Sequence, residues 1–99
     1  MNPAGFLILA GVIFGVGAVI FLARANPLIL LMAIEVMFGG ANLALLAAGR
    51  AHGGPEGQVA ALLVIAVAAA EAAVGLAILV MIYRREPGMA VDLLSRLKG

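Results

Sequence analysis

Two glutamates lie inside long apolar stretches, and they are the residues of this sequence best suited to chemistry. Glu35 lies within the stretch 28–49 and Glu71 within the stretch 59–83. An ionised carboxylate in membrane hydrocarbon costs about 2.5–3.5 kcal/mol on insertion scales, so such residues are functional by default. Removal from water also penalises the charged form of a carboxyl group and favours proton uptake. The pair predicts a proton relay, with interhelical hydrogen bonding as the structural alternative.

The chain offers neither carboxylate a cation within the apolar stretches. No Lys, Arg or His occurs in the stretches 4–23, 28–49 and 59–83. Glu35 and Glu71 must therefore be protonated, hydrated in a cavity or paired with groups from another protein. Glu71 is twelve residues from each end of its stretch, whereas Glu35 is seven residues from Leu28, about 10 Å at 1.5 Å per residue. We expect the two groups to lie at different depths.

Three residues near the glutamates extend this candidate site. Asn42 follows Glu35 by seven residues, which places it on the same helical face, where it could bind water or a partner. Gly39 follows Glu35 by four residues, and Gly75 follows Glu71 by four. Both glycines are expected to leave space beside the carboxylates.

The elements that position these residues are three transmembrane helices. Hydrophobic residues make up 66% of the 99 residues and charged residues 11%, against about 45–50% and 25% in soluble domains. This composition excludes a soluble enzyme, a disordered tail and a nucleic-acid binder with a basic face. Each apolar stretch reaches the roughly 20 residues needed to span a bilayer. We predict an all-α integral membrane protein with a single domain, 1–99, spans at about 4–23, 28–49 and 59–83, and a short amphipathic tail, 84–99.

Turn-forming residues separate the predicted spans. Pro27 suits the first turn of the second helix, and a turn-rich loop is expected over 50–58. Cleavage of the first span as a signal peptide is disfavoured because no Lys or Arg precedes it and it exceeds the usual 7–15 apolar residues. In the tail, Asp92 and Arg96 have the i, i+4 spacing of a helical ion pair, so a short helix there is expected to dock on a partner or the membrane surface.

The positive charges predict the orientation of the chain. Five of the six Lys and Arg residues fall on the side of the first loop and the tail, and only Arg50 falls on the other side. Cytoplasmic loops carry the excess of such residues. The N-terminus is therefore expected outside the cell and the C-terminus in the cytoplasm.

Small residues indicate close helix packing. Gly11 and Gly15 form a GxxxG pair in the first span, and the third span is almost entirely small over 66–75. Such residues let helix backbones approach closely. They could serve packing within this chain or packing against neighbouring subunits, and several small faces favour the second interpretation.

Other residues are weaker candidates for chemistry. His52 is expected in a solvated loop, Met32 and Met37 are expected to pack, and Tyr83 is expected to anchor the interface. The chain has no cysteine, which excludes disulfides and Cys-ligated zinc or iron–sulfur clusters within it. We predict no metal and no cofactor bound by this chain.

Several segments carry a resemblance to a known family. They are residues 57–60 (GQVA) and 68–77 (AAAEAAVGLA), residues 28–37 (LILLMAIEVM) followed by Asn42-Leu43, and the ending 91–99 (VDLLSRLKG). These segments closely resemble the K subunits of bacterial complex I, the proton-pumping NADH–quinone oxidoreductase. The resemblance covers nearly the whole chain. Its most specific part is the block of small residues around Glu71.

The resemblance implies a role and neighbours. Glu35 and Glu71 would match the family's two intramembrane glutamates, in the proton path between the quinone-site region and the antiporter-like subunits. Arg24 would be a supporting polar residue of the first loop. The partners would be the J and N subunits, with A and H toward the quinone end. NADH, FMN, iron–sulfur clusters and quinone would be used by the complex, in a bacterial inner membrane, and the chain itself would be non-redox.

The chain departs from the family's pattern at two places. Arg24 is followed by Ala25 where many members carry paired arginines. Residues 39–41 (GGA) stand where many have Leu or Ile and Asn. Three alternatives to complex I remain. The first is a rotor-ring subunit of an ATP synthase, although such subunits normally have two helices. The others are a subunit of a cation/proton antiporter or membrane-bound hydrogenase complex, and a purely structural membrane subunit.

Overall fold

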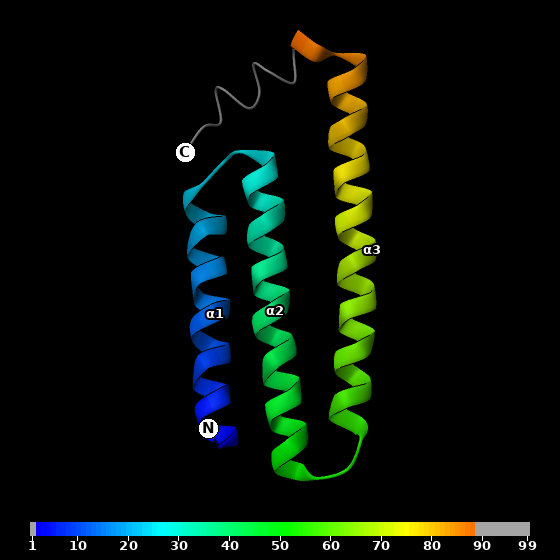
Figure 1. The fold of residues 1–99 in the computed structure, drawn as a ribbon. Helices are drawn as coiled ribbons and strands as arrows, with labels where there is room; N and C mark the ends of the chain where they lie inside the picture. The colour runs from blue at the N-terminus through cyan, green and yellow to red at the C-terminus, as the bar shows by residue number, and fades with distance from the viewer. Residues whose placement is uncertain (1, 89–99) are drawn as a thin grey trace.

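The computed structural model describes residues 2–88 and consists there of three long helices (Figure 1). They are α1, Pro3–Ala23, α2, Pro27–His52, and α3, Glu56–Arg85. All three are long and apolar enough to cross a membrane. The predicted three-span architecture is confirmed, with bounds that differ from the predicted ones by at most three residues. The predicted tail helix around Asp92 and Arg96 lies outside the described residues.

An asparagine followed by a proline begins each of the first two helices. The Asn26 Oδ1 accepts hydrogen bonds from the backbone N–H groups of Leu28, at 2.9 Å, and Ile29, at 3.4 Å. Pro27 follows at the first helical position, where its missing N–H costs nothing. Asn2 caps α1 in the same way, ahead of Pro3. Both helix starts thus follow from local sequence, because the side chains satisfy amides that the helix leaves unpaired.

The connection between α2 and α3 is shorter than the predicted loop. Helix α2 continues through Arg50 to His52, and α3 begins at Glu56, so only Gly53, Gly54 and Pro55 connect them. Both glycines have positive φ angles, 86° and 85°. This left-handed backbone is open to glycine at no steric cost, which allows the chain to reverse within three residues.

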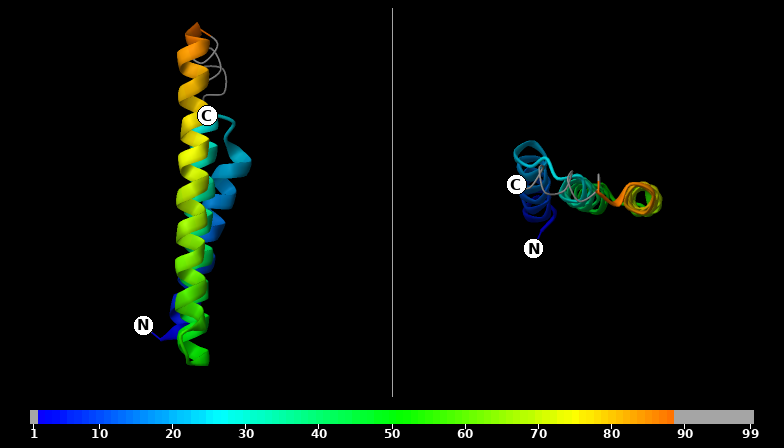
Figure 2. Two further views of the ribbon diagram at one scale, coloured as in Figure 1. Left: turned by 90° about the vertical axis from the view of Figure 1, so that its right-hand side faces the viewer. Right: turned by 90° about the horizontal axis from the view of Figure 1, so that it is seen from above.

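The three helices stand side by side in a single layer. Figure 2 shows them from above as a row, with α2 between α1 and α3. The molecule measures 53 × 24 × 15 Å. Seen edge-on, the axes of α2 and α3 are nearly aligned, and the axis of α1 is inclined to both (Figure 2). Since one layer has no interior, both of its faces are open to lipid or to other subunits.

Glycine and alanine make the contact between α1 and α2. The buried residues here include Gly17 on α1 and Ala33 and Gly40 on α2. A Cβ atom on Gly40 would lie 2.7 Å from the Phe14 nitrogen, and one on Gly17 would lie 2.9 Å from the Ala33 oxygen. These two glycines therefore allow the backbones to touch, as small residues do between membrane helices.

The glycine pair predicted to mediate close packing has no such role within the chain. A Cβ atom on Gly11 or Gly15 would meet no atom within 4 Å. Gly17 and Gly40 perform the close approach instead. The GxxxG pair is thus left open on the surface of α1, which excludes the interpretation that it packs against the described part of its own chain.

Candidate functional site

Helix α2 places Glu35 on the side that faces α3. The side chain is half-buried, and its Oε1 atom is buried without a hydrogen-bond partner. Ordinary buried polar atoms have a partner in the protein or in ordered water. The described residues therefore leave this carboxylate oxygen unsatisfied inside an apolar helix.

Asn42 shares the same environment two helical turns further along α2. Its Oδ1 atom is also buried and unpaired. Both side chains line one cavity of about 290 Å³ between α2 and α3. Their predicted placement on one face is confirmed. The full lining also includes Phe38 and Gly39 of α2 and Val64, Ile65, Ala68 and Ala69 of α3.

The two predicted glycines differ in what they do. A Cβ atom on Gly39 would meet nothing within 4 Å, so this glycine leaves open space at the cavity as expected. A Cβ atom on Gly75 would lie 2.9 Å from the Leu31 Cδ1. Gly75 is therefore a packing residue against α2, and the expectation that it leaves space beside Glu71 is wrong.

Glu71 lies at the same level of the helix pair as Glu35. Gly49 contacts Gly57 at one end of the pair, and Leu31 contacts Gly75 toward the other. Moving one residue forward along α2 therefore corresponds to moving one residue backward along α3, as in any antiparallel helix pair. Glu35 is four residues after Leu31 and Glu71 is four before Gly75, so this antiparallel register places them opposite in height.

The prediction of different depths is therefore wrong for this helix pair. That prediction assumed that the start of the stretch 28–49 and the end of the stretch 59–83 lie at the same height along the helix pair. In the structure α3 continues past the start of α2, as Figure 1 shows. Counting residues from the nearest end consequently underestimates how far Glu35 lies along the pair.

The environment of Glu71 nevertheless differs from that of Glu35. The Glu71 side chain is exposed on α3 and does not line the α2–α3 cavity. Its neighbours on the helix surface are small, since Ala68 precedes it by three residues and Gly75 follows it by four. Glu35 thus lines a space between two helices of its own chain, whereas the Glu71 side chain is exposed.

The remaining sequence candidates lie away from the two carboxylates. Arg24 is exposed at the end of α1, where its backbone N–H donates to the Ile20 oxygen at 3.0 Å. His52 is exposed as expected but lies in the last turn of α2 rather than in a loop. Met37 packs on Gly17 as predicted. Met32 is exposed, so its expected packing within the chain is not observed.

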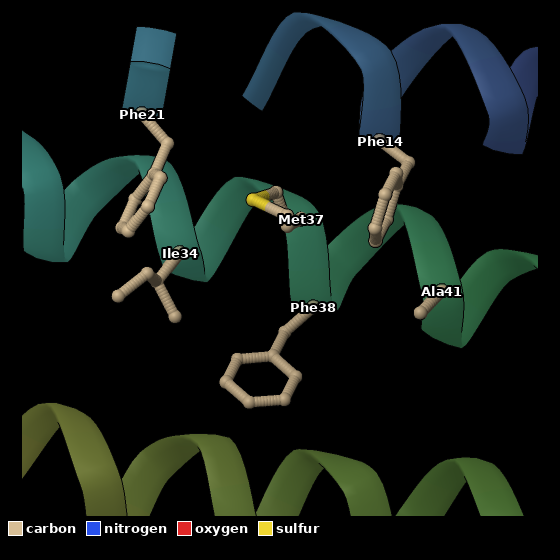
Figure 3. A pocket seen from close by; sticks show the side chains of 6 residues that line it. All are labelled: Phe14, Phe21, Ile34, Met37, Phe38 and Ala41. Carbon is tan, nitrogen blue, oxygen red and sulfur yellow. The ribbon is translucent and has the colours of Figure 1, made fainter. Parts of the chain in front are cut away.

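A second pocket, between α1 and α2, contains no polar side chain (Figure 3). It has a volume of about 280 Å³ and is lined by Phe14, Phe21, Ile34, Met37, Phe38 and Ala41. Phe38 also lines the Glu35 cavity. Analysis of the sequence missed Phe38 at the site, although its spacing of three residues from Glu35 is the signal that could have found it.

Comparison with known proteins identifies the family of this chain. Residues 5–99 match the family described as NADH-ubiquinone/plastoquinone oxidoreductase chain 4L. A protein of Symbiobacterium thermophilum named NADH-quinone oxidoreductase subunit K 1 is 50% identical over 93 residues, covering 94% of this chain and 91% of the relative. Proteins of Chromohalobacter salexigens and Pseudomonas fluorescens named NADH-quinone oxidoreductase subunit K are 50% and 45% identical with the same coverage.

These matches decide between the classes that the composition left open. The match extends over nearly the whole chain and the relatives share one name, which favours complex I over a rotor ring or an antiporter subunit. Three apolar helices agree with a multi-pass membrane subunit. The chain belongs to the NADH-ubiquinone/plastoquinone oxidoreductase chain 4L family, the family of this membrane subunit of complex I.

Proposed function

We propose that this chain contributes Glu35 and Glu71 to the proton-translocation path of NADH–quinone oxidoreductase. The observation that carries the proposal is the buried, unpaired Glu35 oxygen inside an apolar helix, with Glu71 at the same level on the adjoining helix. A carboxyl group held there at a cost in solvation is suited to take up and release a proton. The level arrangement favours lateral transfer along the membrane plane over two stations at successive depths.

We further propose that the chain takes no part in electron transfer. Iron–sulfur clusters are held by cysteine thiolates, and the chain has none. Its residues therefore do not fit such a cluster. NADH, FMN, the iron–sulfur clusters and quinone are accordingly assigned to other subunits of the complex, and the action of this chain is confined to protons.

Both faces of the single helical layer are available to neighbouring subunits. Following the family resemblance, we propose that the J and N subunits lie beside this chain, with A and H toward the quinone end. Open small residues support this, since a Cβ atom on Gly11 or Gly15 would meet no described atom within 4 Å. Arg24 remains a proposed supporting residue, at the loop end of this surface.

The structure supports the proposed orientation by placing charges at opposite ends of the helices. Arg24 lies at the end of the layer where α3 terminates with Arg84 and Arg85, and Arg50 lies at the other end. We propose that the first of these ends is cytoplasmic and that the N-terminus is outside. Residues 1–99 would then form one membrane domain with a cytoplasmic tail, 84–99.

Glutamine substitutions test the proton-transfer role. Glutamine nearly preserves the size of glutamate but cannot titrate, so Glu35→Gln and Glu71→Gln complexes should assemble. A positioned proton-transfer group contributes roughly 10²–10⁴-fold, and quinone-linked NADH oxidation and proton pumping should fall together by about 10²-fold at an essential site. Aspartate variants should retain more activity. Reduction of an artificial acceptor at the flavin should persist.

Glu56 provides the matched control. It is an exposed glutamate in the first turn of α3, outside the apolar stretch. Glu56→Gln changes the same functional group without removing a carboxyl from an apolar stretch, so pumping should stay near the wild-type rate. If Glu35→Gln and Glu71→Gln complexes also assemble and pump at that rate, the carboxylates are structural and the proposal fails.

A further inference from the structure

The turn between α2 and α3 forms a pocket that the proposed proton path does not use. It has a volume of about 490 Å³, within the roughly 300–1,000 Å³ of ordinary ligand sites. Two polar side chains line it, Arg50 near the end of α2 and Gln58 near the start of α3. The pocket thus combines one cation with one carboxamide, and its other lining residues are Leu46, Gly49, Gly53 and Gly54.

A contact between two glycines explains why these side chains border one space. A Cβ atom on Gly49 would lie 2.6 Å from the Gly57 Cα, so the backbones of α2 and α3 touch there. Arg50 directly follows Gly49, and Gln58 directly follows Gly57. The close approach of the two helices therefore brings the cation and the carboxamide to the same pocket.

The polar groups of the pocket favour an oxyanion. Among the described residues that line it, only Arg50 is charged. Glu56 is the one carboxylate in residues 50–58, and it lies against Gly54 rather than in the lining. A guanidinium group offers five N–H donors and no acceptor, and the glutamine amide adds two donors. Arginine binds phosphate through two parallel hydrogen bonds, so a phosphate group suits this site.

The pocket lies at the level of the lipid headgroups. Arg50 is the first residue after the apolar stretch 28–49, and Gln58 is the last residue before the stretch 59–83. The hydrocarbon core of a bilayer is about 30 Å thick, and about 40–45 Å with the headgroup regions. Residues just beyond the ends of two apolar spans consequently meet the phosphate groups of phospholipids.

Exposed leucines continue the pocket toward the hydrocarbon. Leu46 precedes Arg50 by four residues and Leu62 follows Gln58 by four, so each lies one turn deeper on the same helical face. Their side chains are 40% and 66% exposed. A free phosphate ion would leave these apolar surfaces uncovered, whereas the acyl chains of a phospholipid cover them. The combination therefore favours a lipid over a free anion.

We propose that this pocket binds the phosphate group of a membrane phospholipid, whose acyl chains lie on Leu46 and Leu62. Arg50 supplies the charge and a planar pair of donors, and Gln58 supplies a further donor from the adjoining helix. The lipid then bridges α2 and α3 at the end of the layer that carries their connecting turn. This site is separate from Glu35 and Glu71 and does not depend on their role in proton transfer.

Photo-crosslinking in the assembled complex tests the proposal. The complex is held in a maltoside detergent, and its native lipid is exchanged for phosphatidylethanolamine that carries a diazirine beside the glycerol. After irradiation, mass spectrometry locates the label along the chain. Residues 46–62 should be labelled well above the level given by a diacylglycerol that has the same diazirine and no phosphate. Equal labelling by the two probes would overturn recognition of the phosphate.

Variants distinguish a bound lipid from lipid that merely surrounds the complex. Arg50→Gln should lower labelling of residues 46–62 by about tenfold, or 1.4 kcal/mol, and Arg50→Lys should retain more because it keeps the charge. Gln58→Leu removes one neutral hydrogen bond and should lower labelling roughly threefold. Arg84→Gln is the matched control, since it makes the same change at the opposite end of α3. Labelling unchanged in both Arg50→Gln and Gln58→Leu would overturn the site.

Two further outcomes separate the phospholipid from other occupants. An excess of inorganic phosphate should leave the labelling unchanged, and its loss under that competition would show that the site takes the free anion instead. A lack of label on residues 46–62 in the wild-type complex would show that protein covers the pocket. Either result would overturn the lipid site.

Discussion

Two adjacent glycines of α2 allow a sharp test of how α1 and α2 pack. A Cβ atom on Gly40 would lie 2.7 Å from the Phe14 nitrogen and 2.9 Å from the Ala10 oxygen, whereas one on Gly39 would meet nothing within 4 Å. Gly40→Ala should therefore weaken the contact between the helices. Gly39→Ala changes the same residue type at the next position and should not.

The magnitude follows from the geometry. Both atoms that the Gly40→Ala methyl group meets belong to the backbone of α1, so no side-chain rotation can relieve the contact. Ordinary contact begins near 3.4 Å, so α1 must move by about 0.7 Å, and such overpacking typically costs about 1–3 kcal/mol. Both variants share the gain of about 0.5–1 kcal/mol for replacing a helical glycine by alanine. The difference between them should therefore be the overpacking cost alone.

Heating the detergent-solubilised complex provides the assay. Samples are held at a series of temperatures, and the amount of this chain that remains in the assembled complex is measured on a native gel. The Gly40→Ala chain should be lost at a lower temperature than the wild type, and the Gly39→Ala chain at the same temperature or a higher one. Equal loss of the two variants would refute the packing of α1 on α2 through Gly40.

Three further predictions concern the helix ends and the orientation. Gly57→Ala should destabilise the α2–α3 pair in the same heating assay, because its Cβ would lie 2.6 Å from the Gly49 Cα; unaltered stability would contradict that contact. Asn26→Ala should cost about 1 kcal/mol, the usual value of a helix cap, with Asn26→Asp close to wild type; equal loss in both variants would argue against the cap. A cysteine placed at Ala25 should react with a membrane-impermeant thiol reagent only after the membrane is opened, and one at Ala51 should react in spheroplasts with intact membranes. The opposite pattern would reverse the orientation.

Much of the fold was predictable from local sequence. The length and composition of the apolar stretches determine three membrane-spanning helices, because only a helix pairs all of its backbone groups within one such segment. Asn26 and Pro27 mark the start of α2 through capping and a preset φ angle. The face shared by Glu35 and Asn42 follows from helical periodicity alone.

The sequence could not determine which faces of the helices meet. In a soluble helix the apolar stripe identifies the packed side, but lipid is as apolar as a helix interface, so a membrane helix shows little such contrast. The predicted pair Gly11 and Gly15 is consequently open, while Gly17 and Gly40 make the contact. Composition identified the right kind of residue but not the right positions.

The spatial relation of the two glutamates was decided by tertiary structure alone. The level of Glu35 relative to Glu71 depends on the register of α2 against α3, which the contacts of Gly49 with Gly57 and of Leu31 with Gly75 establish. Distance along the chain contains no information about that register, because the helices differ in length and their ends are not level. The sequence by itself determined that two carboxylates lie within the membrane spans. Only the packing of α2 on α3 placed them at one height and left Glu35 lining a cavity and Glu71 exposed.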